Sequence, residues 1–206
     1  VQGEGGIRTA SNSYWKAVRK KCSETGTLLI FDEIQTGLGR TGKLFCFEHF
    51  DIVPDILLLA KALGGGLPLG AFISSQENMN KLTYNPALGH ITTFGGHPVS
   101  CAAALAHLQL LLENKIWEQA EEKGQMIENI VATLPNVKEI RRKGLLMAID
   151  FKDSEYSLKM YHQWLQCGIF TDWFLFCDSA LRIAPPLIIG DLEINNFALR
   201  LSHTIG

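Results

Sequence analysis

The chain has 206 residues, of which 47% are hydrophobic and 19% are charged. This balance is typical of a globular protein with enough apolar residues for one large domain or two small ones. The formal net charge of −2 gives no electrostatic basis for binding nucleic acid or an anionic membrane. No apolar run reaches the length that a membrane-spanning helix needs.

Residues 1–113 alternate strand-like and helix-like segments. Strands are expected at residues 27–31, 56–60 and 71–74, and helices at residues 13–22 and 98–113. Such alternation predicts an α/β domain with a mostly parallel sheet that helices cover on both faces.

Residues 114–206 have a different pattern. A charged amphipathic helix is expected at residues 116–134, and Pro135 ends it. Short strands are expected at residues 137–141, 145–151, 168–171 and 180–184, with helices at residues 158–166 and after Asp191, the expected N-cap. Strands joined by short turns favour an antiparallel α+β domain. We therefore place a domain boundary near Glu113.

The five cysteines and six histidines are dispersed along the chain. The cysteines form no C-x-x-C pair and the histidines no i, i+4 pair, so we expect neither a disulfide framework nor a bound metal. Reduced cysteines make the cytoplasm the simplest location. The chain begins at Val1 within a glycine-rich turn and has no signal-like segment, which indicates the interior of a longer protein.

Lys61 follows the apolar run Ile56–Ala60 and precedes the triple glycine at residues 64–66. A lysine at the end of a buried strand is costly when charged, so we expect a lowered pKa and a nucleophilic amine. Asp32 ends the preceding strand. An amine and a carboxylate at adjacent strand ends suit a Schiff-base enzyme that uses pyridoxal 5′-phosphate (PLP). A lysine that extends its amine into solvent near a solvated acid fits the same residues.

The segment Gly37–Lys43 matches the phosphate-loop pattern G-x-x-x-x-G-K. A nucleoside triphosphatase needs Ser or Thr after the lysine to hold Mg²⁺, and this chain has Leu44 there. The acidic strand also runs straight into this loop, whereas the two come from separate strands in an ATPase. We therefore reject the ATPase interpretation.

Five segments together resemble one family. They are Val1–Gly6, Phe31–Gly42, Pro54–Gly66, Thr92–Pro98 and Leu181–Leu187. In their order and spacing they are similar to the class III (ω) aminotransferases, and most like the acetylornithine, ornithine and 4-aminobutyrate group. The resemblance implies a partial type I PLP-transferase fold. Residues 1–113 would be the second half of the large PLP-binding domain, and residues 114–206 the small C-terminal domain.

The resemblance also implies roles for the cofactor-binding residues. Lys61 would be the Schiff-base lysine and the base that moves the substrate proton. Asp32 would pair with the pyridine nitrogen of PLP, Gln35 would hydrogen-bond its 3′ oxygen and Ile34 would pack against its ring. Thr93 would reach the cofactor phosphate of the other subunit, although a simple turn threonine fits there too.

Two further residues would bind substrate. Arg182 resembles the arginine that clamps the α-carboxylate, and Glu4 resembles the glutamate that pairs with this arginine when an ω-amine donor is bound. A surface acid in a glycine turn is the other interpretation of Glu4. The aromatic residues Trp173, Phe174 and Phe176 are expected in the core of the small domain, or else at the substrate entrance.

The resemblance implies a cytoplasmic homodimer with shared active sites and small-molecule substrates. It would transfer an amino group from an ω-amine donor, such as acetylornithine, ornithine or 4-aminobutyrate, to 2-oxoglutarate, giving an aldehyde and glutamate. A PLP aminomutase of the glutamate-1-semialdehyde type and an inactive half-domain fragment are the alternatives. The family's phosphate-binding turn and ring-stacking aromatic would precede Val1. Phe94 and His97 stand where relatives often carry Tyr and Asn.

Overall fold

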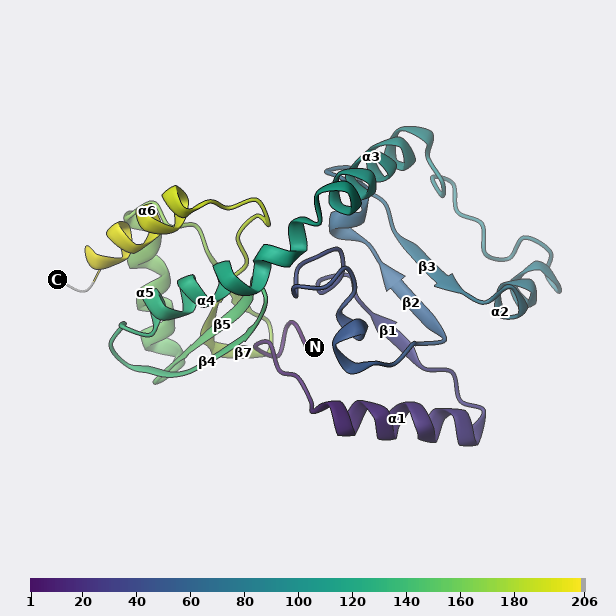
Figure 1. Cartoon of the computed structure of the whole chain (residues 1–206), viewed down its shortest axis with the longest axis horizontal. Coiled ribbons are helices and arrows are strands. Elements are labelled where there is room, and N and C mark those ends of the chain that lie inside the picture. The colour runs from purple at the N-terminus through teal and green to yellow at the C-terminus, as the bar shows by residue number, and fades with distance from the viewer. Residues whose placement is uncertain (205–206) are drawn as a thin grey trace. The chain divides into compact units, whose positions relative to one another are not determined.

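The computed structural model describes residues 1–204 (Figure 1). It divides into two compact units, and each is treated by itself. The C-terminal unit consists of Val1–Thr9, Gly39–Gly42 and the chain from Ile116 onward, and the N-terminal unit consists of Ala10–Leu38 and Lys43–Lys115. The boundary between the units therefore lies between Lys115 and Ile116. Val1–Thr9 and Gly39–Gly42, which were expected in the first domain, belong to the C-terminal unit. Among residues 1–204, no helix is long and apolar enough to cross a membrane.

The N-terminal unit contains one mixed sheet. Its strands are β1 (Ile30–Asp32), β2 (Ile56–Leu59) and β3 (Ala71–Ser74), and its helices are α1 (Asn12–Thr25), α2 (Gln76–Asn80) and α3 (Pro98–Asn114). Short 3₁₀ helices lie at η1 (Cys46–Phe50), η2 (Lys61–Gly64) and η3 (Lys81–Thr83). The sheet order is β1-β2-β3, with β1 and β2 parallel and β2 and β3 antiparallel. The described part of the sheet thus has one parallel pair where a mostly parallel sheet was expected.

Helix α1 begins and ends at residues that the sequence suits to those positions. The Ser11 side chain accepts a hydrogen bond from the Tyr14 N–H, which satisfies one free donor of the first turn. Gly26 ends the helix in the left-handed conformation with φ 67°, which glycine adopts without a steric penalty.

Apolar side chains of the N-terminal sheet remain exposed in the described chain. Ile30 on β1 and both Phe72 and Ile73 on β3 are exposed. Leu105 and Leu112 on α3 are exposed as well. A sheet normally buries its apolar face against another layer, so residues 1–204 provide only part of the packing that these elements need.

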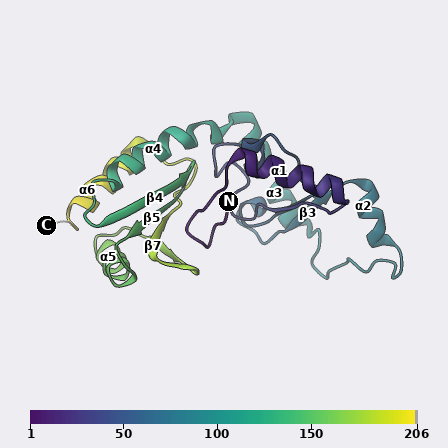
Figure 2. The same ribbon diagram turned by 90° about the horizontal axis from the view of Figure 1, so that it is seen from below.

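The C-terminal unit is an antiparallel sheet with three helices (Figure 2). Its strands are β4 (Val137–Lys143), β5 (Leu146–Phe151), β6 (Asp172–Phe174) and β7 (Cys177–Ile183), in the order β4-β5-β7-β6. Its helices are α4 (Ala120–Val131), α5 (Ser154–Gln166) and α6 (Asp191–Ser202), and the 3₁₀ helix η4 (Ile116–Gln119) precedes α4. All its strand pairs are antiparallel, which confirms the expected α+β arrangement.

Two local predictions in this unit are wrong. The strand expected at residues 168–171 is absent, because Gly168 has φ 75° and turns the chain after α5, so that the strand begins only at Asp172. Gly190 rather than Asp191 is the N-cap of α6. Its N–H donates to the Glu193 carboxylate at 2.9 Å, which closes the first turn without a side-chain cap.

Strand β5 lies between two apolar clusters, which explains why all of its residues except Asp150 are apolar. Met147, Ile149 and Phe151 are buried with residues of α4, α5 and α6. Leu146 and Ala148 point to the opposite face and are buried with residues that include Ile7, Phe174 and Ala180. Because successive strand residues face opposite sides, a strand buried on both faces needs apolar residues at most of its positions. The segment Val1–Thr9 therefore contributes to the covering of the second face.

The central residues of the glycine loop that imitates a phosphate loop, Gly39–Gly42, are a structural part of the C-terminal unit. The Arg40 guanidinium donates to the carbonyl oxygens of Leu145 at 3.1 Å and Pro185 at 2.5 Å. Burial lowers the pKa of Arg40. The Leu145 N–H donates back to the Arg40 carbonyl oxygen at 3.0 Å. At Gly144 a Cβ would lie 2.5 Å from the Thr41 carbonyl carbon, so only glycine allows this approach.

Candidate active site

The sequence-predicted lysine and aspartate lie at the ends of neighbouring parallel strands. Asp32 is the last residue of β1 and is in register with Leu58 of β2, and Lys61 follows the end of β2. The carboxyl ends of parallel strands meet at one edge of a sheet, where α/β proteins bind their ligands. The Ile34 N–H donates to Asp32 Oδ1 at 3.0 Å, which fixes the carboxylate at the start of the turn.

Lys61 has a left-handed backbone, with φ 48°. This conformation costs a residue other than glycine roughly 1–2 kcal/mol, so the fold must hold it in place. Gly65 supports the same turn, because a Cβ there would lie 2.7 Å from the Ala103 carbonyl oxygen of α3. The triple glycine thus allows the sharp turn that the sequence predicted.

The expected burial of Lys61 and Asp32 is wrong for the described chain, because both side chains are exposed. The physical reason is the small extent of the sheet. Three strands and their helices leave the carboxyl edge of β1 and β2 open to solvent.

Glu33 organises the turn after β1, and sequence reasoning missed it. Its side chain is buried, and its two carboxylate oxygens accept the N–H groups of Cys46 at 2.6 Å and Phe47 at 2.7 Å. Burial raises the pKa of Glu33 despite these two hydrogen bonds. The half-buried residues Ile34 and Gln35 follow directly, so this anchor fixes the segment in which they lie. The only signal in the sequence was the acid beyond an apolar strand, since its partners come 13 and 14 residues later.

Thr93 is exposed in the turn that precedes α3. The Gly95 N–H donates to the Thr92 carbonyl oxygen at 3.3 Å, and Gly96 has φ 69°. Pro98 then begins the helix. The threonine and glycines therefore form the expected turn at a helix start, and Thr93 presents its hydroxyl to solvent.

Glu4 and Arg182 form an ion pair although 178 positions separate them in the sequence. Arg182 Nη2 donates to Glu4 Oε1 at 3.1 Å and to Oε2 at 2.9 Å. The side chains are 17% and 26% exposed for Arg182 and Glu4, so the pair is mostly shielded and still reachable from solvent. Both residues belong to the C-terminal unit. The structure thus brings together the two residues predicted to bind substrate.

Residues of the hairpin formed by β6 and β7 contact both members of this pair. Arg182 also donates to the Trp173 carbonyl oxygen at 3.0 Å, and its Cζ lies 4.8 Å from the centre of the Phe174 ring. On the other side, the Leu175 N–H donates to Glu4 Oε2 at 3.3 Å and the Phe176 N–H to the Glu4 carbonyl oxygen at 3.1 Å. The guanidinium therefore has partners other than the Glu4 carboxylate.

The aromatic segment before β7 is only partly in the core. Phe174 is buried as expected, but Trp173 is 50% exposed and Phe176 is 78% exposed, so the core prediction is wrong for these two. Leu175 and Phe176 connect β6 to β7 in a tight hairpin, and only one side of a hairpin end faces a sheet. The exposed side chains lie in the segment whose main chain holds Glu4 and Arg182.

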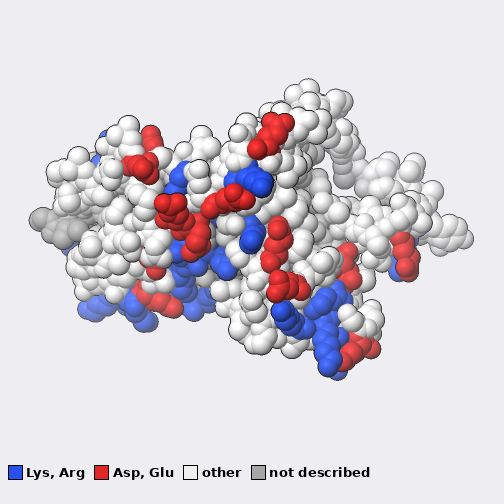
Figure 3. Space-filling view, viewed as in Figure 1, with Lys and Arg blue, Asp and Glu red and all other residues white. Residues whose placement is uncertain are grey.

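No three His, Cys, Asp or Glu side chains of residues 1–204 are placed together to hold a metal ion. The five cysteines are free thiols. On the face shown in Figure 3, basic and acidic side chains lie next to one another. The described chain has ion pairs such as Lys16–Asp51 at 3.2 Å and Arg19–Asp55 at 2.7 Å.

Comparison with known families agrees with this arrangement. The family model for class III aminotransferases matches residues 1–205. The chain belongs to the class III aminotransferase family. This membership confirms the resemblance seen in the sequence and indicates pyridoxal phosphate as the cofactor.

Solved structures of similar proteins agree with the family. An ornithine aminotransferase from Toxoplasma gondii, with PLP at partial occupancy in its active site, is 35% identical and superposes with a TM-score of 0.89. An ornithine aminotransferase from Plasmodium yoelii is 34% identical with a TM-score of 0.87. An acetylornithine aminotransferase from Elizabethkingia anophelis is 33% identical with a TM-score of 0.87. These matches confirm the expected PLP-transferase fold.

The class III chain described here spans about half the length of these structures. The matches cover 99–100% of this chain but 49%, 55% and 52% of the three aminotransferases, in the order given. The residues present fit PLP at the edge of the N-terminal sheet. A free amine in a fixed turn suits an aldehyde, and a carboxylate at the neighbouring strand end suits a protonated ring nitrogen.

Proposed function

We propose that the whole protein transfers an amino group from an ω-amine donor to 2-oxoglutarate, giving an aldehyde and glutamate. The observation that carries this proposal is the ion pair between Glu4 and Arg182. Donors such as ornithine, acetylornithine and 4-aminobutyrate react at an amine that has no neighbouring carboxylate, whereas 2-oxoglutarate has one beside its keto group. One site must therefore serve both kinds of substrate.

Arg182 and Glu4 provide an adjustable carboxylate site. The planar guanidinium suits a bidentate bond to the α-carboxylate of 2-oxoglutarate. When the ω-amine donor is bound, an unpaired arginine in this shielded position would be costly, and the Glu4 carboxylate pairs with it instead. The Trp173 carbonyl oxygen and the Phe174 ring hold the guanidinium in place while Glu4 exchanges with substrate.

The cofactor residues occupy the N-terminal unit. Lys61 Nζ would bind the cofactor and then accept and return the substrate proton. The Asp32 carboxylate would keep the pyridine nitrogen protonated. Ile34 would pack against the ring, and Gln35 would donate to its 3′ oxygen. When bound, PLP supplies the electron sink that stabilises negative charge at the substrate carbon.

We also infer a homodimer in the cytoplasm. The exposed Thr93 hydroxyl, in a glycine turn that leads into α3, is suited to an anion such as the cofactor phosphate of a second subunit. Sedimentation of the full-length protein with PLP should give a dimer at assay concentration. A fully active monomer would contradict the shared site.

The test of the transfer reaction follows its two halves separately in the full-length protein. Arg182→Ala should slow the half-reaction with 2-oxoglutarate by about a hundredfold or more, since a carboxylate loses its charged partner. The half-reaction with the ω-amine should change by less than about tenfold, because it does not use that contact. Single-turnover absorbance of the cofactor measures both rates. Equal slowing of both halves would contradict the proposal.

A further inference from the structure

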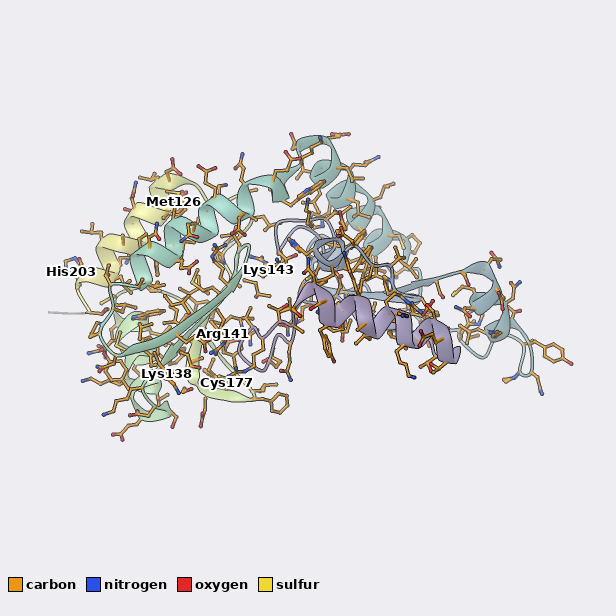
Figure 4. The ribbon with its side chains drawn as sticks, turned by 60° about the horizontal axis from the view of Figure 1, so that its bottom comes forward. Met126, Lys138, Arg141, Lys143, Cys177 and His203 are labelled. Carbon is orange, nitrogen blue, oxygen red and sulfur yellow. The ribbon has the colours of Figure 1, made fainter. Side chains whose placement is uncertain are left out.

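Arg141, a residue that the proposed reaction does not use, connects the main chain near Glu4 to the sheet of the C-terminal unit. Its side chain lies on β4 and is 9% exposed. Its Nε donates to the Gly6 carbonyl oxygen at 2.5 Å, and its Nη1 donates to Asp150 Oδ2 at 2.8 Å and also to Glu139. Nη2 lies 3.6 Å from the sulfur of Cys177, and Figure 4 labels Arg141 and Cys177.

The turn that carries Glu4 is fitted closely to this guanidinium. The Gly6 N–H donates to the Gly3 carbonyl oxygen at 3.2 Å, so Glu4 lies within the turn. Gly6 has φ 86°, and a Cβ there would lie 2.7 Å from Arg141 Nη2 and 2.9 Å from the Cys177 sulfur. Only glycine allows both the backbone conformation and the approach.

Two fixed points therefore hold the main chain at Glu4 and two residues after it. One is the bond from Arg141 to Gly6, and the other is the bond from the Phe176 N–H to the Glu4 carbonyl oxygen. Asp150 fixes Arg141 in turn, and it also accepts a hydrogen bond from Ser179 Oγ at 2.7 Å. A carboxylate that must leave Arg182 and return needs a main chain that stays in place.

We propose that Arg141 is a positioning residue for Glu4 and thereby sets the preference for ω-amine over α-amino donors. This inference rests on the proposed function of Glu4 and Arg182. Without Arg141, the turn loosens, Glu4 pairs less often with Arg182, and the free guanidinium binds the α-carboxylate of donors such as glutamate.

The neighbouring residue Arg142 is a matched control. Its side chain is 8% exposed, and it donates to Glu128 at 2.7 Å and to Glu121 at 2.9 Å. These partners belong to α4, so Arg142 is an equally buried, doubly paired arginine on the same strand without a link to the Glu4 turn.

The first measurement does not depend on catalysis. Hydrogen exchange of the full-length protein reports the amides of Leu175 and Phe176, which donate to Glu4. Arg141→Ala should speed their exchange by about tenfold or more and leave the amides of β5 unchanged, whereas Arg142→Ala should not affect Leu175 and Phe176. Unchanged exchange at these two amides, or a matching loss of protection in β5, would overturn the proposal.

The second measurement is donor preference with 2-oxoglutarate as acceptor, or with pyruvate where glutamate is the donor. Arg141→Ala should raise the kcat/KM ratio of glutamate to ornithine by about tenfold, and adding Glu4→Ala should produce no more than Glu4→Ala alone, because both changes act through one group. Additive effects would overturn the proposal. If Arg141→Ala does not fold, Arg141→Lys is measured in its place. The lysine ammonium keeps a positive charge near Asp150, but it lacks the planar guanidinium that also reaches the Gly6 carbonyl oxygen.

The two measurements separate this inference from the proposed function. Faster exchange at Leu175 and Phe176 together with a Glu4→Ala enzyme of unchanged donor preference would reject the switch between Glu4 and Arg182, and with it the role of Arg141 in specificity. An altered preference in Glu4→Ala but not in Arg141→Ala would reject the positioning role and leave the switch intact.

Discussion

The two units of the chain hold their proposed functional residues in different ways. In the C-terminal unit, Glu4 and Arg182 bind each other and also contact the strand ends around Trp173 and Phe176. In the N-terminal unit, Lys61 and Asp32 stand at adjacent strand ends and are exposed. The pair proposed to bind carboxylates is therefore complete within the described residues, while the residues proposed to bind the cofactor are positioned but not enclosed.

This difference indicates what each unit needs from the whole protein. Exposed apolar side chains on β1, β3 and α3 accompany the exposed cofactor residues. If the full-length protein is the proposed dimer, further chain and a second subunit should cover this face. The geometry of Glu4 and Arg182 should depend far less on further chain or a second subunit, because the hydrogen bonds described for this pair lie within the C-terminal unit.

The largest effect should come from Lys61. Lys61→Ala should lower turnover of the full-length protein by more than about a thousandfold, since both the covalent attachment and the proton transfer are lost. The variant should still bind some cofactor through its other contacts. Borohydride reduction of the wild-type protein followed by peptide mass spectrometry should find the pyridoxyl group on Lys61. A label on Lys43 or any other lysine would contradict the assignment.

Asp32→Asn should have the next largest effect. The amide keeps the shape of the side chain but not the charge that keeps the ring nitrogen protonated. We expect the rate to fall by at least about a hundredfold, a barrier increase of about 3 kcal/mol. Steady-state kinetics at saturating PLP measures it. Near-normal activity in this variant would remove Asp32 from the mechanism. It would also contradict the proposal that the N-terminal unit holds the cofactor residues.

A smaller effect should come from the ring beside Arg182. Phe174→Leu keeps an apolar side chain at this buried position but removes the π-face that lies 4.8 Å from the guanidinium carbon. Such a contact contributes about 1 kcal/mol, so KM for 2-oxoglutarate should rise roughly fivefold. The rate of the ω-amine half-reaction should not change. An unchanged KM would show that the ring does not help to hold the arginine.

The smallest effect concerns stability. The N–H of Leu29 and the guanidinium of Arg19 hydrogen-bond to the carboxylate of Asp55, and together they lower its pKa. A lowered folded pKa gives stability that is present above the ordinary value near 4 and is lost as the pH falls through the folded pKa. Asp55→Asn should therefore lower the Tm at pH 7 by about 2–4 °C, and the difference should shrink below about pH 4.

Asp51→Asn is the control for this prediction. Its partner Lys16 lies at 3.2 Å, but the Asp51 side chain is 76% exposed and the pair is screened by solvent. The Tm should stay within about 1 °C of the wild type. Equal losses in both variants, or a difference for Asp55→Asn that persists in acid, would contradict the role of its hydrogen bonds.

The limits of helices and strands could be predicted from the sequence where local patterns determine them. The strand expected at residues 71–74 has those limits, and α3 begins at Pro98 as expected. The antiparallel pairing of β3 was not readable, because pairing direction depends on how the chain returns to the sheet. The exposure of Trp173 and Phe176 was missed for a similar reason, since an aromatic run does not reveal a hairpin end.

The candidate site divides in the same way. The positions of Lys61 and Asp32 at strand ends followed from apolar runs that stop at a charged residue. The pairing of Glu4 with Arg182 came from family resemblance, and no local pattern links residues so far apart. Glu33 and Arg141 were missed because their partners are main-chain groups or distant acids, which leave no periodic signal in the sequence.

The most direct test of the exchange between Glu4 and substrate at Arg182 is donor preference in a Glu4→Gln variant. Glutamine keeps the length of the side chain but cannot form the ion pair, so Arg182 should be free for an α-carboxylate. The full-length variant should show a ratio of glutamate to ω-amine kcat/KM at least about tenfold above the wild type. In an Arg182→Ala background the same substitution should have no effect on this ratio. A ratio equal to that of the wild type would show that Glu4 is a surface acid and that the pair is not a switch.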